Sequence, residues 1–222
     1  MKKYLLFSIL FAGTFVLPCA AAVKDTAAAL AALNSAAAKD RLDAIYFLGA
    51  QRTPAAYEAL SKQFQAEKDP YLRTQIVEAL DVNVSTWAVS CAASAADDSN
   101  QAVRQAAAAP LSRLPNDRAA EKKLKALAAD SSEPVRLAVV NSLSVSASTS
   151  SASIIGGVLS DRKGTLKTRR AAAEVLSRMK TPAADAELLK HVSDADPEIK
   201  AAAVSRKPAA AKPSKARPAK KK

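Results

Sequence analysis

One short phrase occurs five times in this sequence, at intervals of about thirty-two residues. Each copy places an arginine ahead of an apolar pattern, and the arginines are Arg41, Arg73, Arg104, Arg136 and Arg169. The copies read DRLDAIYFL at 40–48, LRTQIVEAL at 72–80, VRQAAAAPL at 103–111, VRLAVVNSL at 135–143 and TRRAAAEVL at 168–176. Self-similarity at such a period indicates a repeat architecture, in which each copy is one supersecondary unit.

Each copy predicts an α-helix. The third, fourth and seventh positions after every arginine are apolar, as in Ile76, Val77 and Leu80, and these offsets lie on one helical face. The pairs Asp69-Pro70 and Asp196-Pro197 are typical helix starts, because the acid caps the first turn and proline suits its first position.

A second helix follows in every period. We expect these helices to begin near residues 54, 86, 117, 152 and 182, after short breakers such as GAQRTP and MKTP. The alanine-rich composition with five glycines favours helices over strands. The predicted fold is therefore all-α, an α-solenoid of about five to six helical hairpins. A half repeat at 26–38 would cover its first end, and residues 196–205 would close the other.

The spacing, the acid–proline start and the arginine before the apolar face resemble HEAT repeats, in particular the short HEAT-like repeats of the phycobilisome-lyase type. The resemblance extends over residues 26–205. It implies a stack of helical hairpins, an architecture that serves transport factors, scaffolds, lyases and DNA-repair proteins alike. The marks of tetratricopeptide and ankyrin repeats are absent.

The first 22 residues are typical of a secretory signal peptide. Lys2 and Lys3 precede an apolar run, and small residues follow at Ala21 and Ala22, where cleavage is expected. The run is short for a membrane span. Cys19 lies where a lipoprotein carries its lipid, but Pro18 stands where such signals have a small residue. We therefore expect a periplasmic or secreted protein, with lipidation of Cys19 as the alternative.

The positive charge of the chain is concentrated in its last residues. Of 33 lysines and arginines, two belong to the leader and eight to the tail, which leaves 23 in the body against all 21 acids. The tail, residues 206–222, contains no acid, and its basic residues are Arg206, Lys207, Lys212, Lys215, Arg217, Lys220, Lys221 and Lys222. Its proline, alanine and lysine content predicts a disordered segment beyond a solenoid at 23–205.

Such a tail would bind anionic surfaces without sequence preference. Anionic lipid and lipopolysaccharide are the expected counter-charges in an exported protein, with nonspecific binding of nucleic acid as a further possibility. No aromatic residue is interleaved to stack on bases. The alternative is that the tail only keeps the protein soluble.

The five repeated arginines favour a structural role over ligand binding, because each could pair with an acid or an open backbone carbonyl of the neighbouring copy, and acids recur near the same phase of the repeat. These acids are Asp40, Asp69, Asp98, Asp130 and Asp194. The large aromatics Tyr46, Tyr57 and Trp87 are expected in the core, and any one exposed would be a candidate for protein binding.

The sequence contains no catalytic or cofactor-binding motif that we recognise. His191 has no cysteine or carboxylate cluster at metal-ligand spacing, and it is interpreted as a helix end. No cofactor is expected, and Cys91 is interpreted as a small buried residue. Pro110 should kink or end its helix. Gly156-Gly157, within a serine-rich stretch, indicates that this copy is the least stable or begins its second helix late, and suggests a hinge near 145–157.

These features predict an exported, non-enzymatic scaffold that binds an unknown protein and is tethered by its basic tail. The first alternative is a protein that binds polyanions mainly through the tail. The second is a bilin-lyase-like enzyme, which the resemblance of the repeats suggests and the signal peptide opposes. The face of the stack that binds and the oligomeric state are left open.

Overall fold

Every arginine-containing phrase forms the helix that its apolar spacing predicts. The computed structural model describes residues 25–81, 86–114, 117–146 and 148–206. Within these ranges the chain forms twelve α-helices and no strand. The helices are α1 (Thr26–Ala32), α2 (Ala38–Gln51), α3 (Pro54–Ala66), α4 (Pro70–Asp81), α5 (Thr86–Ala95), α6 (Gln101–Ser112), α7 (Arg118–Ala128), α8 (Glu133–Leu143), α9 (Thr149–Ser160), α10 (Leu166–Met179), α11 (Pro182–Leu189) and α12 (Pro197–Val204).

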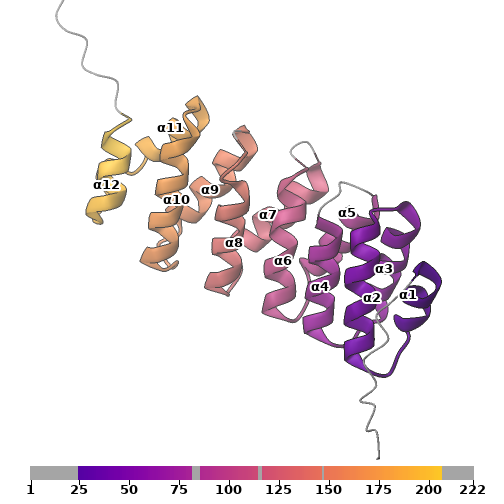
Figure 1. The fold of residues 1–222 in the computed structure, drawn as a ribbon. Coiled ribbons are helices and arrows are strands. Elements are labelled where there is room, and N and C mark those ends of the chain that lie inside the picture. The colour runs from indigo at the N-terminus through magenta and orange to yellow at the C-terminus, as the bar shows by residue number, and fades with distance from the viewer. Residues whose placement is uncertain (1–24, 82–85, 115–116, 147, 207–222) are drawn as a thin grey trace, which may run out of the picture.

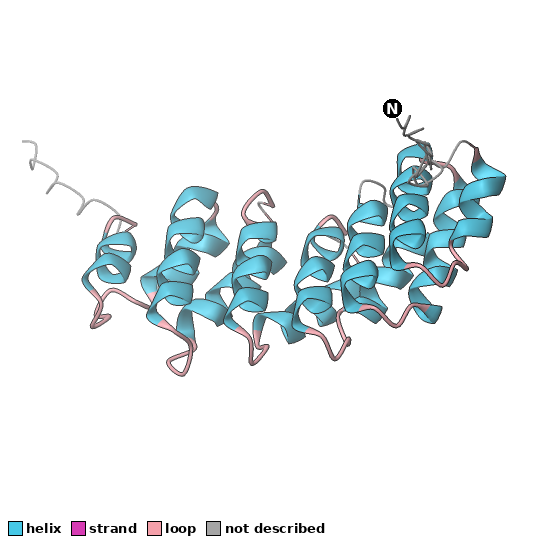
Figure 2. Ribbon diagram, turned by 60° about the horizontal axis from the view of Figure 1, so that its bottom comes forward, coloured by secondary structure: helices cyan, strands magenta, loops and turns pink. Residues whose placement is uncertain are grey.

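The helices form an elongated stack of two layers. The even-numbered helices contact one another in order from α2 to α12, and α3, α5, α7, α9 and α11 form the second layer in the same way. Figure 1 shows the row running from α1 at one end to α12 at the other, and Figure 2 shows the hairpins side by side with loops at their ends. The predicted α-solenoid is confirmed.

The apolar positions of the repeat make a continuous core between the layers. Ile76, Val77 and Leu80 of α4 are each at most 1% exposed, and the corresponding residues of the other four copies are also buried. Because one hairpin has an apolar stripe that only its neighbours can cover, burial at about 25 cal/mol per Å² stabilises the stack as a whole rather than single hairpins.

Polar side chains begin most of these helices. Thr53, Asn100, Thr165 and Thr181, for example, each accept a hydrogen bond from a backbone N–H in the first turn of the following helix. Such caps satisfy N–H groups that have no partner within the helix. The breakers GAQRTP and MKTP each contain such a cap, Thr53 or Thr181. The residue before the cap, Arg52 or Lys180, has a left-handed backbone conformation and ends the preceding helix.

One expectation about the irregular copies needs correction. The helix that contains Gly156-Gly157 does not begin late: α9 starts at Thr149 and continues through both glycines. The reason is local, since Ser148 accepts a hydrogen bond from the backbone of Ser151 and so caps the helix early. Gly156 also leaves space for the side chain of Glu187 in α11. A Cβ atom at position 156 would clash with the Glu187 carboxylate. In α6 the helix continues two residues past Pro110 and then ends.

The two ends of the chain lie largely outside the described residues. This applies to the expected leader at 1–22 and to the tail from Lys207 onward. Arg206 is described, and its Nη1 lies 3.2 Å from Oδ1 of Asp185 in α11. None of the twelve described helices combines the length and the apolar content that crossing a bilayer requires.

Candidate protein-binding face

The repeated arginines join each hairpin to the next. Arg73 of α4 is bidentate, with Nε and Nη2 at 2.8 and 3.0 Å from the carboxylate of Asp98, in the loop before α6. Arg104 binds Asp130 in the same way at 2.7 and 3.0 Å. We call an arginine and the carboxylate 25 or 26 residues later a rung, and the series of rungs the arginine ladder. Each rung joins an even-numbered helix to the loop that precedes the next even-numbered helix.

Three of the five arginines depart from this bidentate pairing with an aspartate. Arg41 binds Glu67, at 2.9 Å from Nε, rather than Asp40 or Asp69, because Asp69 caps α4 through the N–H of Tyr71. Arg169 binds Asp194 through Nη2 alone, at 2.6 Å. Arg136 has no carboxylate partner among the described residues, and its Nη1 donates to the carbonyls of Asp130 and Ser131.

The rungs lower the pKa of their carboxyl groups. Hydrogen bonding from Arg104 holds the pKa of Asp130 below its ordinary value, although partial burial opposes this. Burial is the largest single influence on Glu67, Asp98 and Asp194 and would raise their pKa, but hydrogen bonds from the arginines and the backbone outweigh it. The ladder therefore consists of ionised pairs at neutral pH.

The single histidine of the sequence joins this network. His191 follows α11 and is buried, with Nδ1 at 3.2 Å from Oδ2 of Asp194 and Nε2 at 3.1 Å from the Ser160 hydroxyl. It thus links the last rung to the end of α9. Cys91 is also buried, which raises its pKa to about 12. The described residues hold no group of three or more histidine, cysteine or acidic side chains that could bind a metal.

The three candidate aromatics lie in different environments. Tyr57 is 2% exposed in the core, and Trp87 is half-buried against it. Tyr46 of α2 is 51% exposed, and its hydroxyl donates to Oε1 of Gln75 on α4 at 2.6 Å. A hydrogen bond with Tyr71, which is 55% exposed, raises the pKa of Tyr46. Only Tyr46 therefore remains a surface candidate among the three.

Tyr71 is an exposed aromatic residue that the sequence pattern did not predict. It stands two residues before Arg73, a position that is not part of the apolar pattern of the repeat. The shared offset with exposed Lys39, Ala102 and Lys167 could have placed it on the surface, since each stands two residues before its arginine. Tyr46 and Tyr71 together form an exposed aromatic pair on α2 and α4.

A groove crosses the outer surface of the even-numbered helices. It lies over α4, α6 and α8 and has a volume of about 460 Å³. Its floor consists of the small side chains Ala102, Ala106, Ala109 and Ala138. Polar groups surround this floor, namely Thr74 and Glu78 of α4, Gln105 of α6, and Asn141 and Ser142 of α8. We call this feature the alanine groove.

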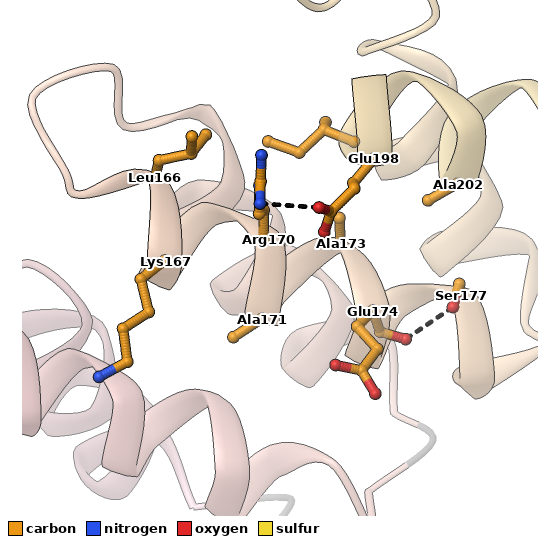
Figure 3. A pocket seen from close by; sticks show the side chains of 10 residues that line it. Leu166, Lys167, Arg170, Ala171, Ala173, Glu174, Ser177, Glu198 and Ala202 are labelled. Carbon is orange, nitrogen blue, oxygen red and sulfur yellow. Dashed lines mark hydrogen bonds and ion pairs between the residues drawn. The ribbon is translucent and has the colours of Figure 1, made fainter. Parts of the chain in front are cut away.

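A second hollow lies further along the same face, between α10 and α12, with a volume of about 620 Å³ (Figure 3). Arg170 and Glu198 face each other across it and form an ion pair at 2.7 Å. Lys167 and Glu174 also line it, from α10. The even-numbered face thus holds an alanine-floored groove at its centre and a charged hollow near its carboxyl-terminal end.

The comparisons with known proteins identify the repeat. Residues 121–205 match the family model described as HEAT repeats. No curated protein matches the chain by sequence. The complex of CpcE and CpcF of phycocyanin lyase from Nostoc sp. PCC7120 is 23% identical with a TM-score of 0.55, over 82% of this chain and 75% of that one.

Designed armadillo repeat proteins are also similar in structure. One, solved in complex with the peptide (KR)4, is 16% identical with a TM-score of 0.53, over 80% of this chain and 96% of that one. Another, designed for modular peptide recognition, is 16% identical with a TM-score of 0.50, over 82% and 98%. At these identities the likeness shows the fold alone. Residues 121–205 therefore resemble HEAT repeats in sequence, and the described residues share the α-solenoid fold of these structures.

Proposed function

We propose that this chain is an exported, non-enzymatic scaffold that holds an extended segment of a partner protein in the alanine groove. The observation that carries the proposal is the groove itself, which runs across α4, α6 and α8. Neighbouring helices pack about 8–10 Å apart, so three helices span roughly 20 Å. This is the length of about six residues of extended chain.

The residues of the groove suit a polypeptide backbone. Alanine side chains leave room for a close approach, while the amides of Gln105 and Asn141 can both donate and accept hydrogen bonds. An extended peptide presents N–H and C=O groups in alternation, which such amides can satisfy. Glu78 would favour a basic residue at the α4 end, and the exposed Tyr46 and Tyr71 continue the face beyond it.

Substitutions in the groove test the proposal. Cross-linking in the cell envelope would first identify the bound protein, and its affinity would then be measured with purified chains. Ala106→Arg fills the floor of the groove and should reduce affinity by at least tenfold. The matched control is Ala126→Arg, at an exposed position of α7 in the other layer. Equal loss in both variants, or none in either, would contradict the proposal.

Attachment to an anionic surface is the proposed role of the tail. The eight basic residues between 206 and 222 support it, at about 1 kcal/mol for each charge close to such a surface. Deleting residues 207–222 should abolish binding to anionic vesicles and leave the protein partner bound. If the partner is lost on deletion but retained by Ala106→Arg, the tail is the principal site and the chain is a polyanion-binding protein.

The non-enzymatic part of the proposal has its own test, because one structural relative is a lyase complex. The chain would be incubated with a bilin and a phycobiliprotein. Formation of a coloured covalent product would show enzymatic activity and overturn this part, whereas scaffolding requires only binding.

A further inference from the structure

The arginine ladder is interrupted at one rung, and the interruption lies between α8 and α10. Arg136 is 9% exposed, and its Nε is buried without a hydrogen-bond partner in the described part of the chain. The Nε atoms of Arg41, Arg73 and Arg104 each bind a carboxylate oxygen at 2.7–2.9 Å. Because buried donors are nearly always paired, this exception requires an explanation.

The carboxylate that would complete the rung is present in the chain. Asp161 follows Arg136 by 25 residues, the separation of Arg73 from Asp98. Its Oδ1 accepts a hydrogen bond from the backbone N–H of Lys163, two residues later, at 2.9 Å. Asp98 makes the same turn with the N–H of Asn100 at 2.8 Å. Asp161 therefore occupies the acid position of the repeat but forms no ion pair with Arg136 in the described structure.

The loop after Asp161 differs in length from the loops after the paired acids. Arg104 stands six positions after Asp98 in the sequence, whereas Arg169 stands eight positions after Asp161. The extra length forms a tight turn, in which the N–H of Gly164 donates to the Asp161 carbonyl at 3.0 Å. A methyl group on Gly164 would lie 3.2 Å from Oδ2 of Asp161, so the turn is wound closely around this carboxylate.

The end of α9 that holds Asp161 borders an open hollow on the surface. A cavity of about 240 Å³ lies between α7 and α9, and Lys125, Ile154, Gly157 and Asp161 are among its lining residues. A methyl group added to Gly157 would meet nothing within 4 Å. Gly157 is exposed and Asp161 is half-buried, so the carboxylate stands at the edge of this open hollow, where a change of its position requires no repacking of the core.

We propose that the junction between α8 and α10 is a conformational joint with two states. The structure holds the open state. In the closed state Asp161 accepts hydrogen bonds from Nε and Nη2 of Arg136, as Asp98 and Asp130 do from their arginines. Closure turns α9–α12 relative to the repeats before them, and so changes the position of the charged hollow of α10 and α12 relative to the alanine groove. This joint is independent of the proposed function, since it concerns the shape of the stack.

Distance measurements in the full chain test the joint. Spin labels at Asn141 and Ser205 span it. Asn141 stands five positions after Arg136, and Ser205 stands five positions after Lys200, the basic residue at the corresponding position of a sixth, incomplete copy. The matched pair Glu78 and Asn141 spans two intact rungs at the same phase. We expect two distance components for the first pair and a single component for the second.

Two variants assign the components. Asp161→Asn keeps the turn with Lys163 but removes the charge, and should leave only the open component. Deletion of Lys163 and Gly164 restores the six-residue spacing and should leave only the closed one. The Glu78–Asn141 distances should be the same in all three chains. A distribution between Asn141 and Ser205 that Asp161→Asn leaves unchanged overturns the proposal, whether or not the deletion variant folds.

Discussion

The Nε of Arg104 lies 2.7 Å from Oδ2 of Asp130, although the two residues are 26 positions apart in the sequence. The contact joins α6 to the loop before α8, and Nη1 of the same guanidinium donates to the carbonyls of Asp98 and Ser99 before α6. One side chain therefore binds the loops before and after its hairpin, which consists of α6 and α7. This geometry makes each rung a link between three consecutive hairpins.

Replacing Arg104 with alanine should destabilise the stack. The change leaves Asp130, whose side chain is 11% exposed, without its charged partner, and the expected loss is about 1–3 kcal/mol in the free energy of unfolding. Denaturant unfolding followed by circular dichroism measures it. The control is Lys125→Ala, which breaks an exposed pair with Glu121 and should cost less than about 0.5 kcal/mol. An unchanged midpoint with lost partner binding would instead assign the arginine to a binding site.

Acidification should destabilise the protein through the same rungs. The pKa values of Glu67, Asp98, Asp130 and Asp194 are lowered in the folded state. A lowered pKa stabilises the fold at pH values above the unfolded value of about 4, and this contribution is lost as pH falls through the folded value. Thermal midpoints between pH 7 and pH 2 should therefore drop below about pH 4. A flat profile across this range would contradict the ladder.

Two glycines should respond in opposite directions to the same substitution. A methyl group on Gly49 would lie 2.8 Å from Cβ of Ala79, so Gly49→Ala must separate α2 from α4 and should cost about 1–3 kcal/mol. Gly157→Ala meets open space and should stabilise α9 by about 0.5–1 kcal/mol, since alanine favours helix. Urea unfolding of both variants gives the two signs. A change of the same sign in the free energy of unfolding of both variants would contradict the packing described for one of the two glycines.

Cys91 should be inert in the folded protein. Burial raises its pKa to about 12, so very little thiolate exists at neutral pH. In the chain from Val23 onward it is the single cysteine. A thiol reagent such as DTNB should react slowly in buffer at pH 8 and rapidly in denaturant. Rapid reaction under native conditions would mean that α5 opens or that the thiol is accessible.

The repeat period, the helices and their buried faces could all be predicted from the sequence. They depend on local patterns, namely offsets of three, four and seven residues and polar or proline residues at helix starts. The fifteen apolar positions that follow the five arginines are all buried, as in Ala107, Ala108 and Leu111 of α6. These local patterns suffice to predict the fold because each helix of a solenoid contacts only its neighbours.

The pairing within the ladder and the surface features depended on the tertiary structure. Several acids stand near the right phase for Arg41, and only the path of the loop between α3 and α4 brings Glu67 to it. Arg136 has an acid at the right separation, Asp161, yet the two form no ion pair in the described structure, and the loop after Asp161 is two residues longer than the loop after Asp98. Tyr46 and Tyr57 are the same residue type, but one is exposed and one is buried. Sequence spacing determines which side of a helix a residue occupies, whereas side-chain contacts between repeats require the directions of loops and the distances between helices.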